Sequence, residues 1–469
     1  KPKNFTVTGN TVDALPDPAN PILPTADGIV ISGTSDNGSP QIGVVDGNSV
    51  RRCRHGILLT GFALTVPIRD FTVSNNIVNE CAKDQDTWDI WDFQDAGTFG
   101  IGCLYAESIV ISGNNIGSVG QVTVDGFTPI NPANNVFPQA LFALNCSLVT
   151  AQGNSIRNTL PYGTGRATNI AILSGNTSVT TECLSPKIEG NSILTNDGIN
   201  PAAHQGILVW ADNPGQEARI RDLSISENTI HTANGGAGNG IGQGIHITAQ
   251  DGGVFDLVRI ESNTVENYLG MGIHLQAGDA SPNGSSFMYV VDVKHNTLQS
   301  MNGGTPHGVF LSAFTDDTHQ KNIYQVTIES NTITNSWGEG VLVQATAADT
   351  TTTGHIGLDL ITVADNEVDR MSSLAANGGA GVYFILNGGA NEKIVTGFPG
   401  WNTPGLQNFS VLRNRLTDVG RGIDILGEDV RGWANFIIDD NYVTGAGSNH
   451  LTPSTDYLNR VQLSLTDNT

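Results

Sequence analysis

Acidic residues recur just after short Gly-led segments in the middle of the chain. They lie six to nine residues beyond the glycine of each segment, at Asp212, Asp251, Asp279, Asp316 and Asp317. If successive segments stack about 5 Å apart, such carboxylates come close enough for the acid/base chemistry of glycoside hydrolases. The same oxygen-rich set would suit Ca²⁺, and loop aspartates also serve simple turns. We predict Asp251, Asp279, Asp316 and Asp317 as candidate catalytic residues.

A histidine and a glutamate hold a second candidate position, directly before the glycine of two successive segments. His307 precedes Gly308, and Glu339 precedes Gly340. A shared register would bring the imidazole and the carboxylate together, and such a pair suits general acid/base catalysis. His307 and Glu339 therefore join the candidate catalytic set, with a purely structural contact as the alternative.

Ring side chains lie at outward positions of these segments, two or four residues after the glycine, at Trp210, His246, His274 and Phe310. Apolar rings offer flat faces to sugars, so we predict these four residues and the nearby Trp337 as a substrate-binding stripe. A subunit interface or packed loops would equally explain an apolar outer stripe. His231, His246 and His274 are spaced by coils rather than as metal ligands. We therefore predict that they are surface residues.

The segment DQDTWDIWDFQD places Trp88 and Trp91 among five aspartates. Carboxylates beside aromatic rings are typical of saccharide sites, so both tryptophans are candidate substrate-binding residues. The competing interpretation is that this loop covers the end or flank of the fold.

One pattern recurs along nearly the whole chain: apolar, any, apolar, two residues, Asn, any, apolar. Its thirteen copies have a mean spacing of about 36 residues and place the asparagine at Asn10, Asn48, Asn76, Asn114, Asn154, Asn191, Asn228, Asn263, Asn296, Asn331, Asn366, Asn414 and Asn441. A Gly-apolar-any-apolar pattern, as in QGILV, QGIHI and EGVLV, follows most copies. Alternation with period two indicates short strands, and strands of constant pattern joined by variable loops indicate a solenoid.

Two clear strands and a weaker third in each period favour a parallel β-helix over a propeller, whose blades need four strands. We predict an all-β, right-handed parallel β-helix of about 12 to 13 coils, forming one domain over residues 1–469 that could be part of a longer chain. Stacked asparagines about 4.8 Å apart would form an amide ladder. Cys53 and Cys81, and likewise Cys146 and Cys183, should stack in adjacent coils, as reduced interior thiols in preference to disulfides.

The G-I-x-I and N-x-[IV] coils resemble the pectin-lyase-like superfamily of right-handed β-helices over residues from about 5 to 450. That superfamily includes polysaccharide lyases, glycoside hydrolases, epimerases and bacteriophage tailspikes. The resemblance implies an extracellular, cell-surface or virion-surface protein that binds and cleaves a polysaccharide. The Asn-Thr-Asp, Asp-Asp, Gly-His-Gly and Arg-Ile-Lys set of polygalacturonases is missing, and so is the Tyr-Gly-Phe-Asp-Pro-His string of alginate epimerases. No catalytic residue is therefore carried over from the superfamily, whose repeat residues specify the fold alone.

The composition and charge of the chain limit the binding partners that we expect. The chain has 45 acidic and 22 basic residues and a formal charge of −23, which argues against nucleic acid. No apolar run reaches the roughly 18 residues of a membrane span. Scarce basic residues favour a hydrolase over a lyase, and no cofactor motif occurs beyond the acidic set that would suit Ca²⁺. The alternative function is a non-catalytic adhesin or filament subunit that associates end to end, whereas a homotrimer would favour a tailspike.

Overall fold

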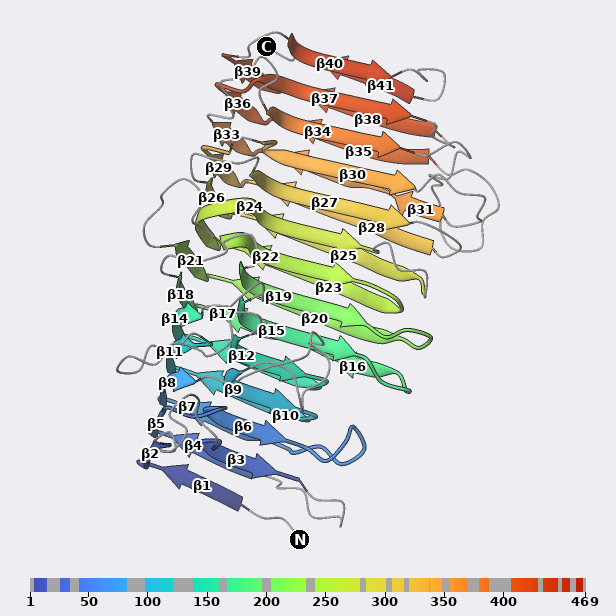
Figure 1. The fold of residues 1–469 in the computed structure, drawn as a ribbon. Coiled ribbons are helices and arrows are strands. Elements are labelled where there is room, and N and C mark those ends of the chain that lie inside the picture. Colours follow the sequence, from blue (N-terminus) through green and yellow to red (C-terminus); the bar gives the residue numbers. More distant parts are fainter. Residues whose placement is uncertain are drawn as a thin grey trace, which may run out of the picture. The chain divides into compact units, whose positions relative to one another are not determined.

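The computed structural model describes residues 4–14, 26–33, 42–81, 98–120, 138–159, 167–195, 204–232, 241–278, 284–300, 306–315, 320–336, 338–347, 355–369, 379–387, 406–428, 433–445, 449–455 and 461–466. Every element among these residues is a β-strand (Figure 1). Over the same ranges, no helix is long and apolar enough to cross a membrane. The chain is thus an all-β parallel β-helix, as the strand patterns predicted.

Two compact units make up the chain. Unit 1 holds Lys1–Asn176, Thr181–Val209 and Ser224–Gly242, and unit 2 holds Thr177–Thr180, Trp210–Leu223 and Gln243–Thr469. The strands β19 (His204–Asp212), β20 (Ala218–Ser226) and β22 (Ile241–Ala249) carry residues of both units. The prediction of one continuous domain stays a prediction.

Unit 1 repeats three strands in each coil, and equivalent strands of successive coils pair in parallel. The strands that precede the ladder asparagine are β1 (Asn4–Thr8), β4 (Ile42–Asp46), β7 (Phe71–Ser74), β10 (Ser108–Ser112), β13 (Leu148–Gln152) and β17 (Lys187–Glu189). Those that follow it are β2 (Thr11–Asp13), β5 (Ser49–Arg51), β8 (Ile77–Cys81), β11 (Asn115–Val119), β14 (Ser155–Thr159), β18 (Ser192–Thr195) and β21 (Thr229–Thr232). The third row holds β3 (Ile29–Ser32), β6 (Ile57–Thr60), β9 (Phe99–Leu104), β12 (Gln139–Leu144) and β15 (Ala167–Gly175). A short strand, β16 (Thr181–Cys183), pairs with β20.

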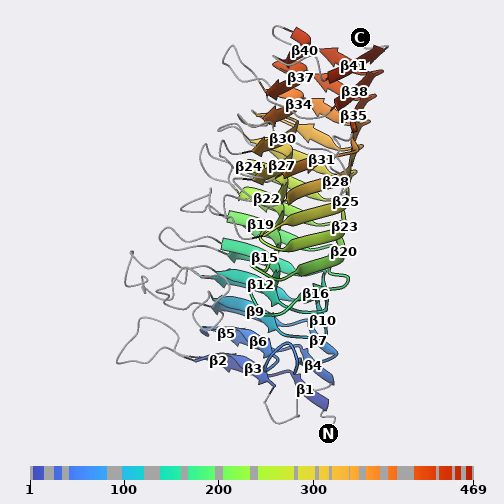
Figure 2. The same ribbon diagram turned by 90° about the vertical axis from the view of Figure 1, so that its right-hand side faces the viewer.

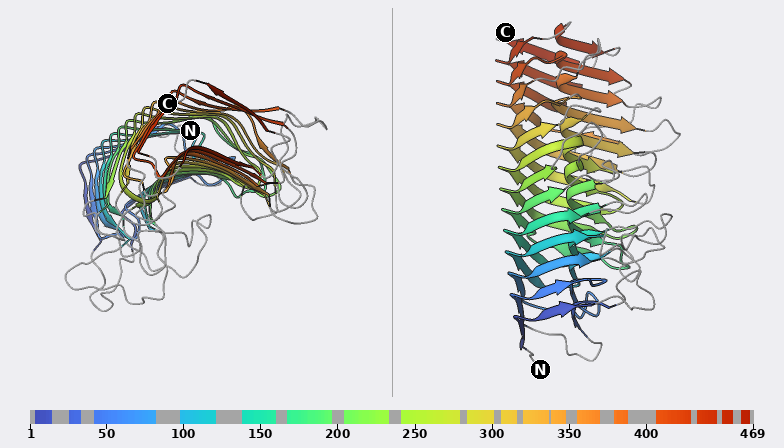
Figure 3. Two further views of the ribbon diagram at one scale, coloured as in Figure 1. Left: turned by 90° about the horizontal axis from the view of Figure 1, so that it is seen from above. Right: turned by 60° about the vertical axis from the view of Figure 1, so that its left-hand side comes forward.

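Unit 2 has the same three rows (Figures 2 and 3). Its strands before the asparagine are β23 (Gly253–Glu261), β25 (Ser286–Lys294), β28 (Gln320–Glu329), β32 (Ile361–Ala364), β35 (Leu406–Leu412), β38 (Trp433–Asp439) and β41 (Val461–Thr466), with β31 (His355–Leu358) also paired to β28. After it come β24 (Thr264–Ala277), β26 (Thr297–Ser300), β29 (Thr332–Thr334), β33 (Glu367–Asp369), β36 (Arg415–Thr417) and β39 (Tyr442–Thr444). The Gly-led row consists of the second half of β24, then β27 (His307–Thr315), β30 (Val341–Ala347), β34 (Ala380–Asn387), β37 (Arg421–Glu428) and β40 (Asn449–Thr455).

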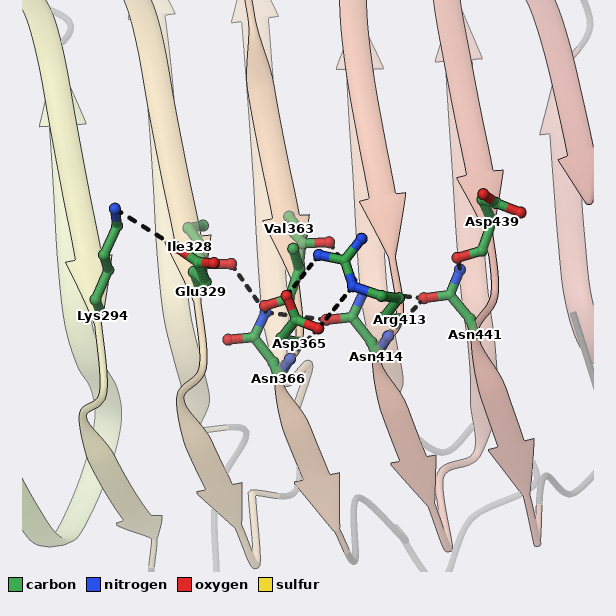
Figure 4. Close-up of polar contacts among 11 residues, drawn as sticks. Lys294, Ile328, Glu329, Val363, Asp365, Asn366, Arg413, Asn414, Asp439 and Asn441 are labelled. Atoms are coloured by element: carbon green, nitrogen blue, oxygen red, sulfur yellow. Dashed lines mark hydrogen bonds and ion pairs between the residues drawn. The ribbon is translucent and has the colours of Figure 1, made fainter. Parts of the chain in front are cut away.

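The repeat asparagines form the predicted ladder in each unit. In unit 2 the Oδ1 atom of Asn331 accepts hydrogen bonds from the backbone and side-chain nitrogens of Asn296, both at 3.0 Å. Its Nδ2 atom donates to Oδ1 of Asn366 at 2.9 Å. Figure 4 shows the ladder continuing through Asn366, Asn414 and Asn441. The ladder satisfies buried backbone groups at the bend between two strands, which explains why the amide recurs in every coil.

The residue before each ladder asparagine has a left-handed backbone conformation. In unit 1 it is often glycine, as at Gly9 (φ 65°) and Gly47 (φ 63°). In unit 2 it is never glycine, and Ser262, His295, Ser330, Asp365, Arg413 and Asp440 have φ from 52° to 57°. A side chain in this conformation costs about 1 kcal/mol or more, so the ladder holds each of these turns in a strained geometry.

Ser330→Gly is expected to raise the free energy of unfolding by about 0.5 to 1 kcal/mol, because glycine adopts the left-handed turn without strain. Chemical denaturation of the wild type and the variant measures the difference. Ser330→Ala is the matched control, since it removes the same hydroxyl and keeps the strained Cβ. A Ser330→Gly variant that is less stable than Ser330→Ala would contradict this account of the turn.

The five cysteines lie inside unit 1 and are all free thiols. The Cys146 thiol lies 3.5 Å from the backbone oxygen of Cys103 in the neighbouring coil. Burial raises the pKa of the Cys81, Cys103 and Cys183 thiols and takes that of Cys146 to about 12. The reduced interior ladder is therefore the arrangement that the fold contains, and these thiols are chemically inert packing residues.

Candidate functional site

The outward positions of the Gly-led row in unit 2 form one continuous column. Two residues after each glycine, His274 pairs with Phe310, Phe310 with Leu342, Leu342 with Tyr383 and Tyr383 with Asp424 in adjacent strands. The intervening residues point into the core, as Ile273 and Leu275 do, each with 0% exposure. The strand register thus brings side chains from β24 to β37 onto one face, as the alignment of the repeats predicted.

The rings of this column stack on one another. His246 and His274 lie with centroids 4.6 Å apart and planes 4° apart, and His274 and Phe310 with centroids 4.8 Å apart and planes 5° apart. Nδ1 of His274 contacts Gln243 at 3.3 Å, and its Nε2 contacts Ser312 at 3.0 Å. Both faces and both nitrogens of His274 are therefore occupied by its neighbours.

This packing bears on two expectations, that His246 and His274 are surface residues and that their rings offer flat faces to sugars. His246 and His274 are only 8% and 6% exposed, so they are not surface residues. Burial, followed by the charges of His246 and His307, lowers the pKa of His274 well below its usual range, which keeps its imidazole neutral. The sequence shows that the rings share a column, but it does not show that they cover each other's faces. The stack therefore has a structural role and offers no free face to a sugar at His274.

Beside this stack lies a group of five polar and ionisable side chains, which we call the polar cluster: His307, Glu339, Tyr383, Arg421 and Asp424. Nδ1 of His307 lies 2.6 Å from Oε2 of Glu339, which is the pair that their shared register predicted. The same nitrogen lies 3.2 Å from the backbone nitrogen of Glu339. A protonated Nδ1 donates to the carboxylate, and an unprotonated Nδ1 accepts from the backbone amide.

Arg421 reaches Glu339 across an intervening coil. In register, the residues that precede the glycines of β30, β34 and β37 are Glu339, Ala380 and Arg421. The small side chain of Ala380 leaves room above it, and Nη2 of Arg421 lies 3.9 Å from Oε1 of Glu339. Nη1 of Arg421 contacts Oδ2 of Asp424, and the guanidinium carbon lies 4.9 Å from the ring centroid of Tyr383.

The two carboxyl groups have opposite electrostatic environments. Burial opposes ionisation of Glu339, but the hydrogen bond and charge of His307, a backbone hydrogen bond and the charge of Arg421 outweigh it and lower the pKa. Burial raises the pKa of Asp424 above its usual range, and the negative charge of Glu339 adds a smaller contribution. Arg421 and a backbone hydrogen bond from Ile425 to the carboxyl group oppose the shift. One carboxyl group with a lowered pKa beside another with a raised pKa is the pattern expected of an acid/base pair.

Two atoms of the polar cluster are buried without a hydrogen-bond partner among the described residues, Oδ1 of Asp424 and Nε of Arg421. Asp424 as a whole is 5% exposed. A buried polar atom without a partner costs about 1 to 3 kcal/mol, so such atoms mark a place where a water molecule or a ligand completes the structure.

The other predicted site residues lie elsewhere. Asp251 is only 4% exposed, in the turn between β22 and β23, where its Oδ1 atom lies 3.6 Å from Nζ of the buried Lys321. Trp210 is half-buried on β19. The candidates Asp279, Asp316, Asp317, Trp337, Trp88 and Trp91 lie outside the described residues. Among the residues that are described, no group of three or more His, Cys, Asp or Glu side chains could hold a metal ion.

Sequence reasoning missed three members of the polar cluster as site residues. A signal for each was present. Arg421 precedes its glycine as His307 and Glu339 do, and Tyr383 and Asp424 occupy the column that was assigned to ring residues. Comparison of the chain with models of known protein families and with curated protein sequences gave no match. Function is therefore argued from the polar cluster itself.

Proposed function

We propose that this protein is a carbohydrate-active β-helix that hydrolyses a polysaccharide at the polar cluster of unit 2. The observation that carries the proposal is the pair of carboxyl groups, Glu339 and Asp424, held by one guanidinium group and shifted in pKa in opposite directions. Both carboxyl groups contact the same guanidinium group, Glu339 at Nη2 and Asp424 at Nη1 of Arg421.

In the proposed reaction Asp424 is the acid and Glu339 the carboxylate. Asp424 gives a proton from Oδ1, the oxygen that Arg421 does not contact, to the glycosidic oxygen as the bond to the anomeric carbon breaks. Glu339, as the carboxylate, takes the proton of the water that attacks the anomeric carbon. In the alternative route Glu339 attacks the anomeric carbon itself, and water then cleaves the resulting ester while the deprotonated Asp424 takes the proton of that water. Arg421 holds both carboxyls in place, and His307 keeps Glu339 ionised.

The fold and its coil motifs support placing the protein near the pectin-lyase-like superfamily, whose members include hydrolases and tailspikes that act on polymers. Because the polysaccharides on which these hydrolases and tailspikes act lie outside cells, we propose that the protein works at the cell exterior or on a virion surface. Both carboxyl groups contact Arg421, so the one guanidinium group of the described cluster is already paired, which favours hydrolysis over elimination.

A panel of polysaccharides tests the proposal, with reducing ends measured for hydrolysis and absorbance at about 235 nm for the unsaturated products of a lyase. The wild type is run beside a Glu339→Gln, Asp424→Asn double variant. New reducing ends that the double variant fails to produce would support the proposal. Absence of product from every polymer would remove it, and absorbing products would replace hydrolysis by elimination.

The activity is expected to have an acidic pH optimum. As pH rises through the lowered pKa of Glu339, the carboxylate forms and kcat/KM increases. As pH rises further through the raised pKa of Asp424, the general acid loses its proton and kcat/KM falls. Initial rates from about pH 3 to 8 measure this bell-shaped profile. A flat profile across that range, or an optimum in alkaline solution, would contradict the assigned roles.

A further inference from the structure

The contacts of Arg421 determine which kinds of ligand the polar cluster can accept. Its Nη1 and Nη2 atoms face Asp424 and Glu339, and its guanidinium plane lies over Tyr383. The side chain of Arg421 is 29% exposed, while that of Asp424 is 7% exposed. The positive charge of Arg421 is therefore already paired with the Glu339 carboxylate, and its Nη1 donor is taken by Asp424.

Two buried atoms of the polar cluster have no hydrogen-bond partner among the described residues, and they differ in whether they donate or accept. Nε of Arg421 is a donor, and Oδ1 of Asp424 accepts as a carboxylate or donates as an acid. A hydroxyl group, which is uncharged, satisfies either atom, and a glycosidic oxygen accepts from Nε or from a protonated Oδ1. A ligand carboxylate would pair with the single Nε donor and would lie near the Glu339 carboxylate that already pairs with Arg421, where like charges repel.

The net charge of the whole chain also disfavours anionic substrates. A formal charge of −23 produces a negative potential that lowers the local concentration of anionic polymers. A neutral chain of sugars meets no such barrier and does not require an unpaired cation.

From these contacts and charges we infer that the glycan cleaved at the polar cluster is neutral, and that a uronic acid is excluded from the sugar position beside Asp424 and Arg421. This inference rests on the proposed hydrolase function and adds the substrate class to it.

Matched polymers that differ only in charge test the inference. Polygalacturonate, alginate and xanthan are each compared with their carboxyl-reduced derivatives, together with neutral galactans, mannans and glucans. Reducing ends are measured with the wild-type chain at low and at physiological salt, and with Glu339→Gln as the control for the site. The expected result is at least a tenfold higher rate on reduced or neutral polymers, with little dependence on salt.

The outcomes separate this inference from the proposed function. A higher rate on a native uronate polymer than on its reduced form, lost in Glu339→Gln, would overturn the neutral substrate and leave the hydrolase intact. If no polymer yields product, or if Glu339→Gln keeps full activity, both the proposed function and this inference are overturned.

Discussion

Glu339→Gln is expected to lower kcat by about 10²- to 10⁴-fold, the usual contribution of a positioned acid or base. The amide keeps the size of the side chain and its place between His307 and Arg421, but it can neither take a proton nor attack carbon. Asp424→Asn should have a comparable effect, because its amide cannot protonate the leaving oxygen.

Glu329→Gln is the matched control for these variants. Glu329 lies on β28 with its side chain 36% exposed, and its carboxylate pairs with Lys294 at 3.5 Å. The same chemical change at that position should leave kcat unchanged. Wild-type turnover in Glu339→Gln would exclude the polar cluster as the catalytic centre and return attention to the aspartates outside the described residues.

Lys321→Met is expected to lower the free energy of unfolding by about 3 to 5 kcal/mol, because it leaves a buried carboxylate without its counter-charge. Lys321 is 1% exposed, and its Nζ atom lies 2.5 Å from the backbone oxygen of Gly284 and 3.3 Å from Oγ of Ser286. Asp251 supplies the opposite charge at 3.6 Å. Urea denaturation followed by circular dichroism measures the loss.

The double variant Lys321→Met, Asp251→Asn separates the charge effect from the loss of packing. Because it removes both ions, it should recover a large part of the stability that Lys321→Met loses. Lys294→Met is the exposed control, since its side chain is 28% exposed and a surface pair contributes little. Stability of Lys321→Met within about 1 kcal/mol of the wild type would show that Asp251 is not held as an ion in the interior.

Sequence alone could predict most of the fold, because the same local pattern builds every coil. The asparagine that ends one strand must satisfy buried backbone groups in each turn, so it recurs at Asn296, Asn331 and Asn366 and marks the register directly. The left-handed residue before it was harder to recognise, since glycine occurs there in unit 1 while Ser330 or Arg413 takes that place in unit 2.

The candidate site could be predicted only in part. His307 and Glu339 come together because they share a register in adjacent strands, which a repeat alignment reveals. Arg421 meets Glu339 two strands away, which depends on the length of its side chain and on the small Ala380 between them. Ring orientation is likewise a matter of packing, so the mutual stacking of His274 and Phe310 could not be read from their spacing.

The most direct test of the account is a crystal structure of Glu339→Gln soaked with the longest oligosaccharide that the wild type releases. The account predicts a sugar with its glycosidic oxygen within hydrogen-bond distance of Asp424 Oδ1 and a hydroxyl group on Nε of Arg421. An oligosaccharide bound on another face of the coils, with the polar cluster empty of sugar, would contradict it.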